Sequence, residues 1–268
     1  MFIPQSGVTI HNHNFSVVLS HRRPSKVIIA VPHDGPMRDD FSGIFQIRSS
    51  GVQVRDMHVW QIVSDVTRQC LKFDMTVDTI RFLMARSYVD VNRTMFSEPD
   101  LCPDTAGQTA FDDHGLETMY RYYHSELDRL LDASVREYGA ENVLFLDMHG
   151  FSKQPEFVYN SGGGEYRPFD IILGTANRTT INHGDIDRQL FRFMEMKSYT
   201  VFLPTEKPIF PDGDPYSAGH FTRLYAKRYG INTIQVEIAA CFRMGENSKD
   251  AGEKLAADIS EFLSQYYA

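Results

Sequence analysis

Short apolar stretches alternate with longer amphipathic ones along this chain. The short stretches are nearly continuous in hydrophobic residues, which is typical of strands covered on both faces. They span residues 27–31, 79–85, 142–148, 170–173 and 233–238. In the longer stretches hydrophobic residues recur every three or four positions, as in helices with one buried face. This spacing predicts helices over residues 57–71, 116–138, 185–196, 219–229 and 248–267.

The alternation of strands and helices predicts an α/β fold. We expect three layers, α/β/α, with a mostly parallel or mixed central sheet between two helical layers. No internal repeat or low-complexity tract occurs, so a single domain over residues 1–268 is expected. Stretches rich in glycine and proline predict loops over residues 99–107, 154–168 and 204–215. The second loop contains three consecutive glycines at 162–164 but lacks the ending of a phosphate-binding loop, and we expect a flexible lid there.

Composition and charge narrow the function classes. A chain of 268 residues with 42% hydrophobic residues can bury a core without a disulfide or a structural metal. Its three cysteines, Cys70, Cys102 and Cys241, are odd in number and far apart, which fits a reducing compartment. A net charge of −8 argues against a nucleic-acid partner. Neither a signal peptide nor a membrane-spanning run is present, so we expect a cytoplasmic protein without a membrane partner.

Two of the ten histidines directly follow predicted buried strands: His33 in the segment PHDG and His149 in the segment DMHGF. Ligand crevices in open α/β sheets lie beyond the carboxyl ends of the strands, so both imidazoles are expected to face one cleft. Two satisfied loop histidines are the alternative. Asp147 either orients an imidazole as a hydrogen-bond acceptor or points to the opposite side of the strand.

A catalytic zinc usually takes three protein ligands and a water, so a third ligand is needed. Three aspartates in the first half of the chain are candidates: Asp34, Asp56 and Asp65. Asp56 stands at the predicted start of a helix, where a carboxylate also serves as an ordinary N-cap. His58, two residues later, is a competing ligand.

Charged residues next to predicted strands suggest further roles. Arg86 and Arg93 follow the strand predicted at 79–85, where they would hold a substrate carboxylate or steady an oxyanion, or form a surface salt-bridge loop. Glu237 lies inside an apolar strand, and burying a carboxylate costs several kcal/mol unless it is paired. We expect a general base beside a metal-bound water, or a structural pair with an arginine such as Arg243.

Taken together, these segments resemble the N-formylglutamate amidohydrolase family, which is similar in layout to the zinc carboxypeptidases and aspartoacylase-like deacylases. The resemblance implies a phosphorylase/hydrolase-like fold. The matching segments are VPHDG (31–35), RDMHV (55–59), RSYVDVNR (86–93), YHSELDRLL (123–131), LDMHGF (146–151), PYSAGHFTRLYAKRYG (215–230) and QVEI (235–238).

The resemblance also implies a metal centre with a catalytic acid beside it. One zinc ion per chain would be held by His33, Asp56 and His149, and Glu237 would activate the metal-bound water. The third ligand stays open among Asp56, His58 and Asp34, because the carboxypeptidase HxxE spacing is absent. Pro36 stands where that glutamate would be.

For the substrate, the resemblance implies a small N-acyl amino acid such as N-formylglutamate. Asn92 and Arg93 would grip its carboxylate, Arg86 would contact the oxyanion, and Arg223 would be a further contact. The segment SAGHFTR departs from the Gly-Gly-aromatic run expected there, which leaves open another N-acyl substrate. A zinc carboxypeptidase or poly-glutamate hydrolase is the alternative enzyme, and a binder of acidic metabolites is the non-catalytic alternative. The oligomeric state is open.

Overall fold

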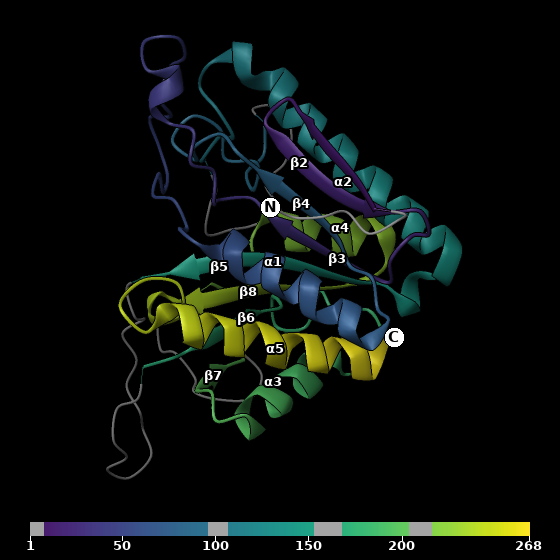
Figure 1. Cartoon of the computed structure of the whole chain (residues 1–268). Coiled ribbons are helices and arrows are strands. Elements are labelled where there is room, and N and C mark those ends of the chain that lie inside the picture. Colours follow the sequence, from purple (N-terminus) through teal and green to yellow (C-terminus); the bar gives the residue numbers. More distant parts are fainter. Residues whose placement is uncertain (1–7, 96–106, 153–167, 204–215) are drawn as a thin grey trace.

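A mixed sheet of eight strands forms the centre of the protein in the computed structural model, which describes residues 8–95, 107–152, 168–203 and 216–268. In spatial order the strands are β1-β2-β4-β3-β5-β8-β6-β7 (Figure 1). Their bounds are β1 (Val8–His13), β2 (Ser16–His21), β3 (Val27–Val31), β4 (Asp78–Phe82), β5 (Leu144–Phe151), β6 (Ile171–Gly174), β7 (Val201–Phe202) and β8 (Asn232–Ala239).

The four central strands determine where a site can form. β4, β3, β5 and β8 are parallel to one another, so their carboxyl ends meet at one edge of the sheet. The flanking strands run the other way: β2 is antiparallel to β4, and β6 is antiparallel to β8. The segments that follow β3 and β4, and the last residues of β5 and β8, therefore come together at this edge.

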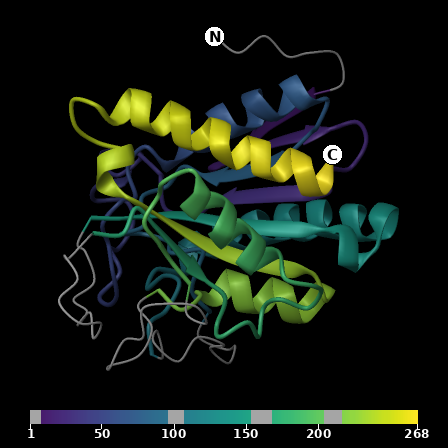
Figure 2. The same cartoon turned by 90° about the horizontal axis from the view of Figure 1, so that it is seen from below.

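Five α-helices cover the two faces of this sheet: α1 (Val59–Cys70), α2 (Glu117–Tyr138), α3 (Ile186–Met196), α4 (His220–Tyr229) and α5 (Ser248–Tyr267). α1, α3 and α5 pack on one face, and α2 and α4 on the other (Figure 2). All five residues of β3 are apolar because both faces of this strand are buried. Val27, Ile29 and Val31 belong to the core under α1 and α5, whereas Ile28 and Ala30 belong to the core under α2. The expected three-layer α/β/α fold is confirmed.

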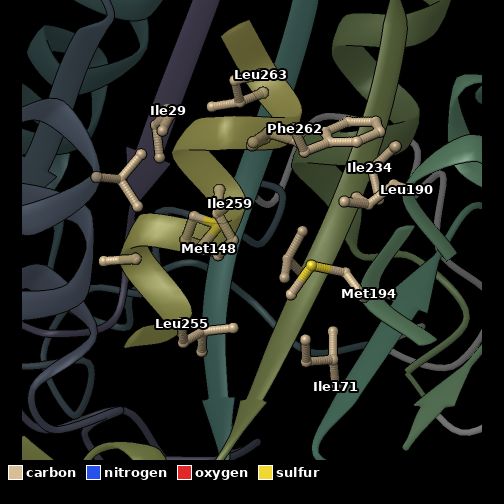
Figure 3. Close-up of a cluster of buried hydrophobic side chains, with 14 of the residues drawn as sticks. Ile29, Met148, Ile171, Leu190, Met194, Ile234, Leu255, Ile259, Phe262 and Leu263 are labelled. Carbon is tan, nitrogen blue, oxygen red and sulfur yellow. The ribbon is translucent and has the colours of Figure 1, made fainter. Parts of the chain in front are cut away.

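The core between α5, α3 and the sheet follows from helical spacing. Leu255, Ile259 and Leu263 recur every fourth residue and are all buried against the strands. Figure 3 shows them along α5, with Ile259 beside Met148 of β5. Burying one such side chain contributes roughly 1.5–3 kcal/mol, so this stripe fixes α5 on the sheet.

The helices begin and end within two residues of their predicted bounds, but three strands were not predicted. β1 and β2 form an edge hairpin of mixed polar and apolar residues, and β7 has only two residues. One boundary differs in a way that concerns the site. β5 continues to Phe151, so His149 lies within the strand and not in a loop after it.

Some predictions fall outside the described residues. They are the lid at Gly162–Gly164, Cys102, and most of the three expected loops. Among the described cysteines, Cys70 is buried and Cys241 is exposed, and both are free thiols. Within the described ranges no helix combines the length and the hydrophobicity needed to cross a bilayer.

Candidate metal centre

Three buried side chains meet at the carboxyl edge of the sheet. His33 follows β3, His149 lies near the end of β5, and Asp56 precedes α1. The Nδ1 atoms of the two imidazoles are 3.0 Å apart. The Oδ2 atom of Asp56 lies 3.3 Å from Nδ1 of His149 and 3.6 Å from Nδ1 of His33. Two imidazole nitrogens and a carboxylate oxygen thus surround one point, which is a donor set typical of zinc.

Each imidazole is held from behind by a carboxylate. Nε2 of His33 lies 2.7 Å from Oδ1 of Asp90, and Nε2 of His149 lies 2.8 Å from Oδ1 of Asp147. A carboxylate only accepts, so each Nε2 carries the proton and donates it. The Nδ1 lone pairs of His33 and His149 then point at each other and need a positive charge between them. The residues present therefore fit a divalent cation.

The electrostatics of the three groups agree with this arrangement. Burial and the nearby Arg86 lower the pKa of His33. Burial alone would lower the pKa of His149 too, but the charge of Asp147 and its hydrogen bond raise it well above the ordinary value. Burial would raise the pKa of Asp56, but the two adjacent imidazoles, that of His149 first, lower it. The pair of imidazoles thus favours one positive charge, next to an ionised carboxylate.

Of the four candidates for the third ligand, only Asp56 joins the cluster in the described part of the chain. The Asp34 carboxylate instead accepts a hydrogen bond of 2.8 Å from the backbone N–H of Trp60, in the first turn of α1. Asp34 therefore caps the helix, which is the role that the sequence offered for Asp56. His58 is exposed, and Asp65 pairs with a neighbour on α1.

Glu237 lies beside the cluster on β8, opposite His149 in the register of β5 and β8. It is buried, and Nε2 of Gln235 donates a 2.8 Å hydrogen bond to its Oε1. Burial raises the pKa of Glu237 to about 7, although the charge of His149 opposes the shift. Arg243 donates to main-chain carbonyl groups and not to Glu237. Arg243 therefore does not form the structural ion pair with Glu237 that the sequence offered as an alternative.

A cluster of guanidinium groups surrounds the buried Asp90. Its Oδ2 lies 2.8 Å from Arg86, 3.5 Å from Arg48 and 3.9 Å from Arg93. Burial would raise the pKa of Asp90, but the charge of Arg86, followed by those of His33 and Arg93, holds it well below its ordinary value. Three guanidinium groups share one carboxylate, so this cluster of arginines carries excess positive charge. Asp90 and Arg48 were not singled out from the sequence, although Asp90 lies within the segment RSYVDVNR.

The other two expected substrate contacts, Asn92 and Arg223, do not belong to this arginine cluster. Asn92 is buried behind His149: its Nδ2 donates to Asp147 over 3.2 Å, and its Oδ1 accepts from the backbone N–H of Phe221 over 2.8 Å. Both ends of its amide are thus engaged within the protein, although Asn92 also lines the cavity that opens over the cluster. Arg223 does not line the same cavity. Its Nε donates to the carbonyl of Ala218, and its side chain lines a separate hollow beside α4.

A cavity of about 540 Å³ opens over the cluster. This size is common for small-molecule sites. Its polar wall includes Arg86 and Arg93, whereas exposed apolar side chains surround part of it: Val52, Val54, Met57 and Tyr216. Burial, and then the charges of Glu237 and Asp56, raise the pKa of Tyr216 to about 12, so its phenol stays protonated above the cluster. Tyr216 was not singled out from the sequence, although it lies within the segment PYSAGHFTRLYAKRYG.

The fold and the cluster define an α/β/α protein with a potential metal centre at the carboxyl edge of its sheet. A sequence profile of N-formylglutamate amidohydrolase matches residues 25–244, so the chain belongs to the N-formylglutamate amidohydrolase family. The resemblance seen in the sequence is confirmed, and with it membership in a family of hydrolases that act on amides.

Solved structures show the same fold. An N-formylglutamate amidohydrolase from Ralstonia eutropha JMP134 is 18% identical with a TM-score of 0.62, over 94% of this chain and 99% of its own. A gene product from Agrobacterium tumefaciens is 15% identical with a TM-score of 0.54, over 98% of this chain and 93% of its own. No curated protein matches the chain by sequence.

Proposed function

We propose that this protein is a zinc-dependent amidohydrolase that cleaves the amide of a small N-acyl amino acid such as N-formylglutamate. One observation carries the proposal: two imidazoles and a carboxylate converge within 4.8 Å of one another, in a cavity that Glu237 also lines. The family match supports the class of reaction. The cationic wall around Asp90 supports an anionic substrate.

His33, Asp56 and His149 would hold the zinc ion. When bound, the ion supplies a Lewis acid that lowers the pKa of a water molecule and polarises a carbonyl. Asp90 and Asp147 keep the Nε2 protons in place, so that both Nδ1 atoms remain available as ligands.

Glu237 is the general base and then the general acid. Its carboxylate takes a proton from the attacking water, and a bond forms between the water oxygen and the acyl carbon. As the C–N bond breaks, Glu237 returns the proton to the departing amine, so that formate and a free amino acid are released. A pKa of about 7 suits both directions of transfer near neutral pH. Gln235 fixes the carboxylate through its hydrogen bond.

The arginines act on the substrate. Arg86 donates N–H groups toward the carbonyl oxygen as negative charge develops on it. Arg93 binds the carboxylate of the amino acid, for which its planar fork of N–H groups is suited. Asn92 supports this wall from behind through Asp147 and the first turn of α4.

The proposal is tested by metal analysis followed by a substrate panel. We expect about one zinc per chain in purified protein and loss of activity after chelation, restored by zinc. N-formylglutamate, N-acetylglutamate, a glutamyl peptide and N-formylleucine are then compared, the last because the cavity has an apolar rim. Faster cleavage of the peptide would favour a carboxypeptidase. A protein that cannot be loaded with metal would be a binder and not a metallohydrolase.

A further inference from the structure

Arg243 is a buried guanidinium that contacts three separate segments of the chain. Its Nε donates to the carbonyl of Ile238 over 3.1 Å, its Nη1 to that of Met57 over 2.7 Å, and its Nη2 to that of Phe151 over 2.9 Å. It follows the short 3₁₀ helix η6 (Ala240–Phe242) and is 5% exposed. Its three nitrogens are thus each used to fix a different stretch of backbone.

These stretches are the ones that carry the proposed centre. The three accepting residues stand one or two positions from its members: Met57 follows Asp56, Ile238 follows Glu237, and Phe151 lies two residues after His149. The segments come from the turn before α1 and from the ends of β8 and β5. Only one guanidinium connects all three in the described part of the chain.

The charge of Arg243 does not by itself explain its place. The charges of Asp56, Glu237 and Asp34 favour the buried guanidinium, but in the described residues no carboxylate lies within ion-pair distance of it, and a positive charge near a cation site opposes binding of the cation. Its shape does explain its place. A guanidinium presents five N–H donors in a rigid plane and satisfies carbonyls in several directions, which a single ammonium group does not do.

Gly150 makes room for this arrangement. A Cβ atom on Gly150 would lie 2.3 Å from Cζ of Arg243 and 2.5 Å from its Nε, so any larger residue would displace the guanidinium. The backbone N–H of Gly150 also donates to Oδ2 of Asp56 over 3.2 Å. Gly150 thus touches both the guanidinium and the carboxylate of the centre.

We propose that Arg243 is a positioning residue that holds the segments of Asp56, His149 and Glu237 at fixed separations through three main-chain hydrogen bonds. The inference rests on the proposed function, because it concerns the same centre. Arg243 lines the cavity, but its Nε, Nη1 and Nη2 all donate to main-chain carbonyls, so it acts through the backbone and not on the substrate. Its loss should therefore change metal affinity as well as turnover.

The zinc affinity of Arg243 variants distinguishes a positioning role from an effect of the positive charge of Arg243. Zinc dissociation constants are measured by competition with a chelator, on folded metal-free protein, for the unaltered chain, Arg243→Lys and Arg243→Met. We expect both variants to bind zinc about 10-fold or more weakly, as is usual when an outer partner of a metal site is lost. If charge were the only role, Arg243→Lys would match the unaltered chain and Arg243→Met would bind zinc more tightly. Either result would overturn the proposal.

Two further variants complete the experiment. Gly150→Ala keeps Arg243 but displaces its guanidinium, and we expect the same weakening of zinc binding, so the proposal stays testable if an Arg243 variant does not fold. Arg178→Lys is the matched control, because Arg178 contacts Gly184, Asp185 and Asp187 and does not line the cavity. An unchanged zinc affinity in folded Gly150→Ala and Arg243→Lys would refute the positioning role of Arg243 but not the proposed function. Absence of zinc binding by the unaltered chain would instead refute the proposed function.

Discussion

The Nδ1 atoms of His33 and His149 lie 3.0 Å apart, although 116 positions separate the two residues in the sequence. The opposite ring nitrogens are both held by carboxylates, at 2.7 Å by Asp90 and at 2.8 Å by Asp147. Two acceptor nitrogens held face to face are unfavourable without a cation between them. The carboxylate of Asp56 beside them completes a site that favours positive charge.

Loss of one imidazole should remove the metal. His149→Ala leaves only His33 and Asp56, so we expect zinc content to fall from about one per chain to near zero and activity to be lost. His58→Gln is the control, since His58 is exposed, is next but one to Asp56 and lies outside the cluster. Elemental analysis of both purified variants provides the measurement. Loss of zinc in His58→Gln with retention in His149→Ala would exclude the ligand set.

Replacement of the proposed base should separate binding from chemistry. Glu237→Gln has nearly the same shape, and its carbonyl can still accept the hydrogen bond from Gln235. We expect zinc content to be unchanged and kcat to fall by about 10²–10⁴-fold, the usual contribution of a positioned acid–base group. Zinc content and initial rates are measured on the same preparation. Full turnover in this variant would end the assignment of Glu237 as the base.

The fold was predictable because its elements are locally encoded. β3 is apolar on both faces, and α5 carries its apolar residues every fourth position, so each element has one stable environment. The hairpin of β1 and β2 was missed because the edge strand β1 is largely exposed and β2 mixes polar with apolar residues, so the hydrophobic signal of both strands is weak.

Only those residues of the metal centre that lie in or directly after a predicted strand could be predicted from the sequence. His33 and His149 follow from their places in the chain, and Glu237 from its apolar strand. The choice between Asp34 and Asp56 was not predictable, because both precede α1 and only the folded backbone decides which one caps the helix. The hydrogen bond of Asp90 to His33 depends on a turn whose path the sequence pattern does not define.

The two arginines of the cavity wall should affect different kinetic constants. Arg86 is proposed to stabilise charge that develops in the transition state, so Arg86→Lys is expected to lower kcat by about 10²-fold or more with little change in KM. Arg93→Lys is expected mainly to raise KM, because a lysine loses the bidentate contact to a carboxylate. Steady-state kinetics on the best substrate of the panel distinguish the two. Equal effects of both variants on KM alone would contradict the role of Arg86.

Acid should destabilise the fold through His124 of α2, which is not a member of the metal centre. Its Nε2 donates to the carbonyl of Val91 over 3.0 Å, and its Nδ1 accepts from the hydroxyl of Tyr225 over 2.9 Å. Burial, and then the charge of His220, lower the pKa of His124 to about 3, against 6.5 ordinarily. The unfolded chain therefore takes up a proton below pH ~6.5 that the folded protein refuses.

The stability that neutral His124 contributes is thus complete above pH ~6.5 and falls by roughly 1.4 kcal/mol per pH unit as the pH drops toward 3. His124→Gln keeps one donor and one acceptor but cannot titrate, so we expect a shallower loss of stability over the same range. Urea unfolding of metal-free protein between pH 7.5 and 4.5 measures the free energy of unfolding for both chains. The same slope in the variant and the unaltered protein would show that His124 does not control this acid sensitivity.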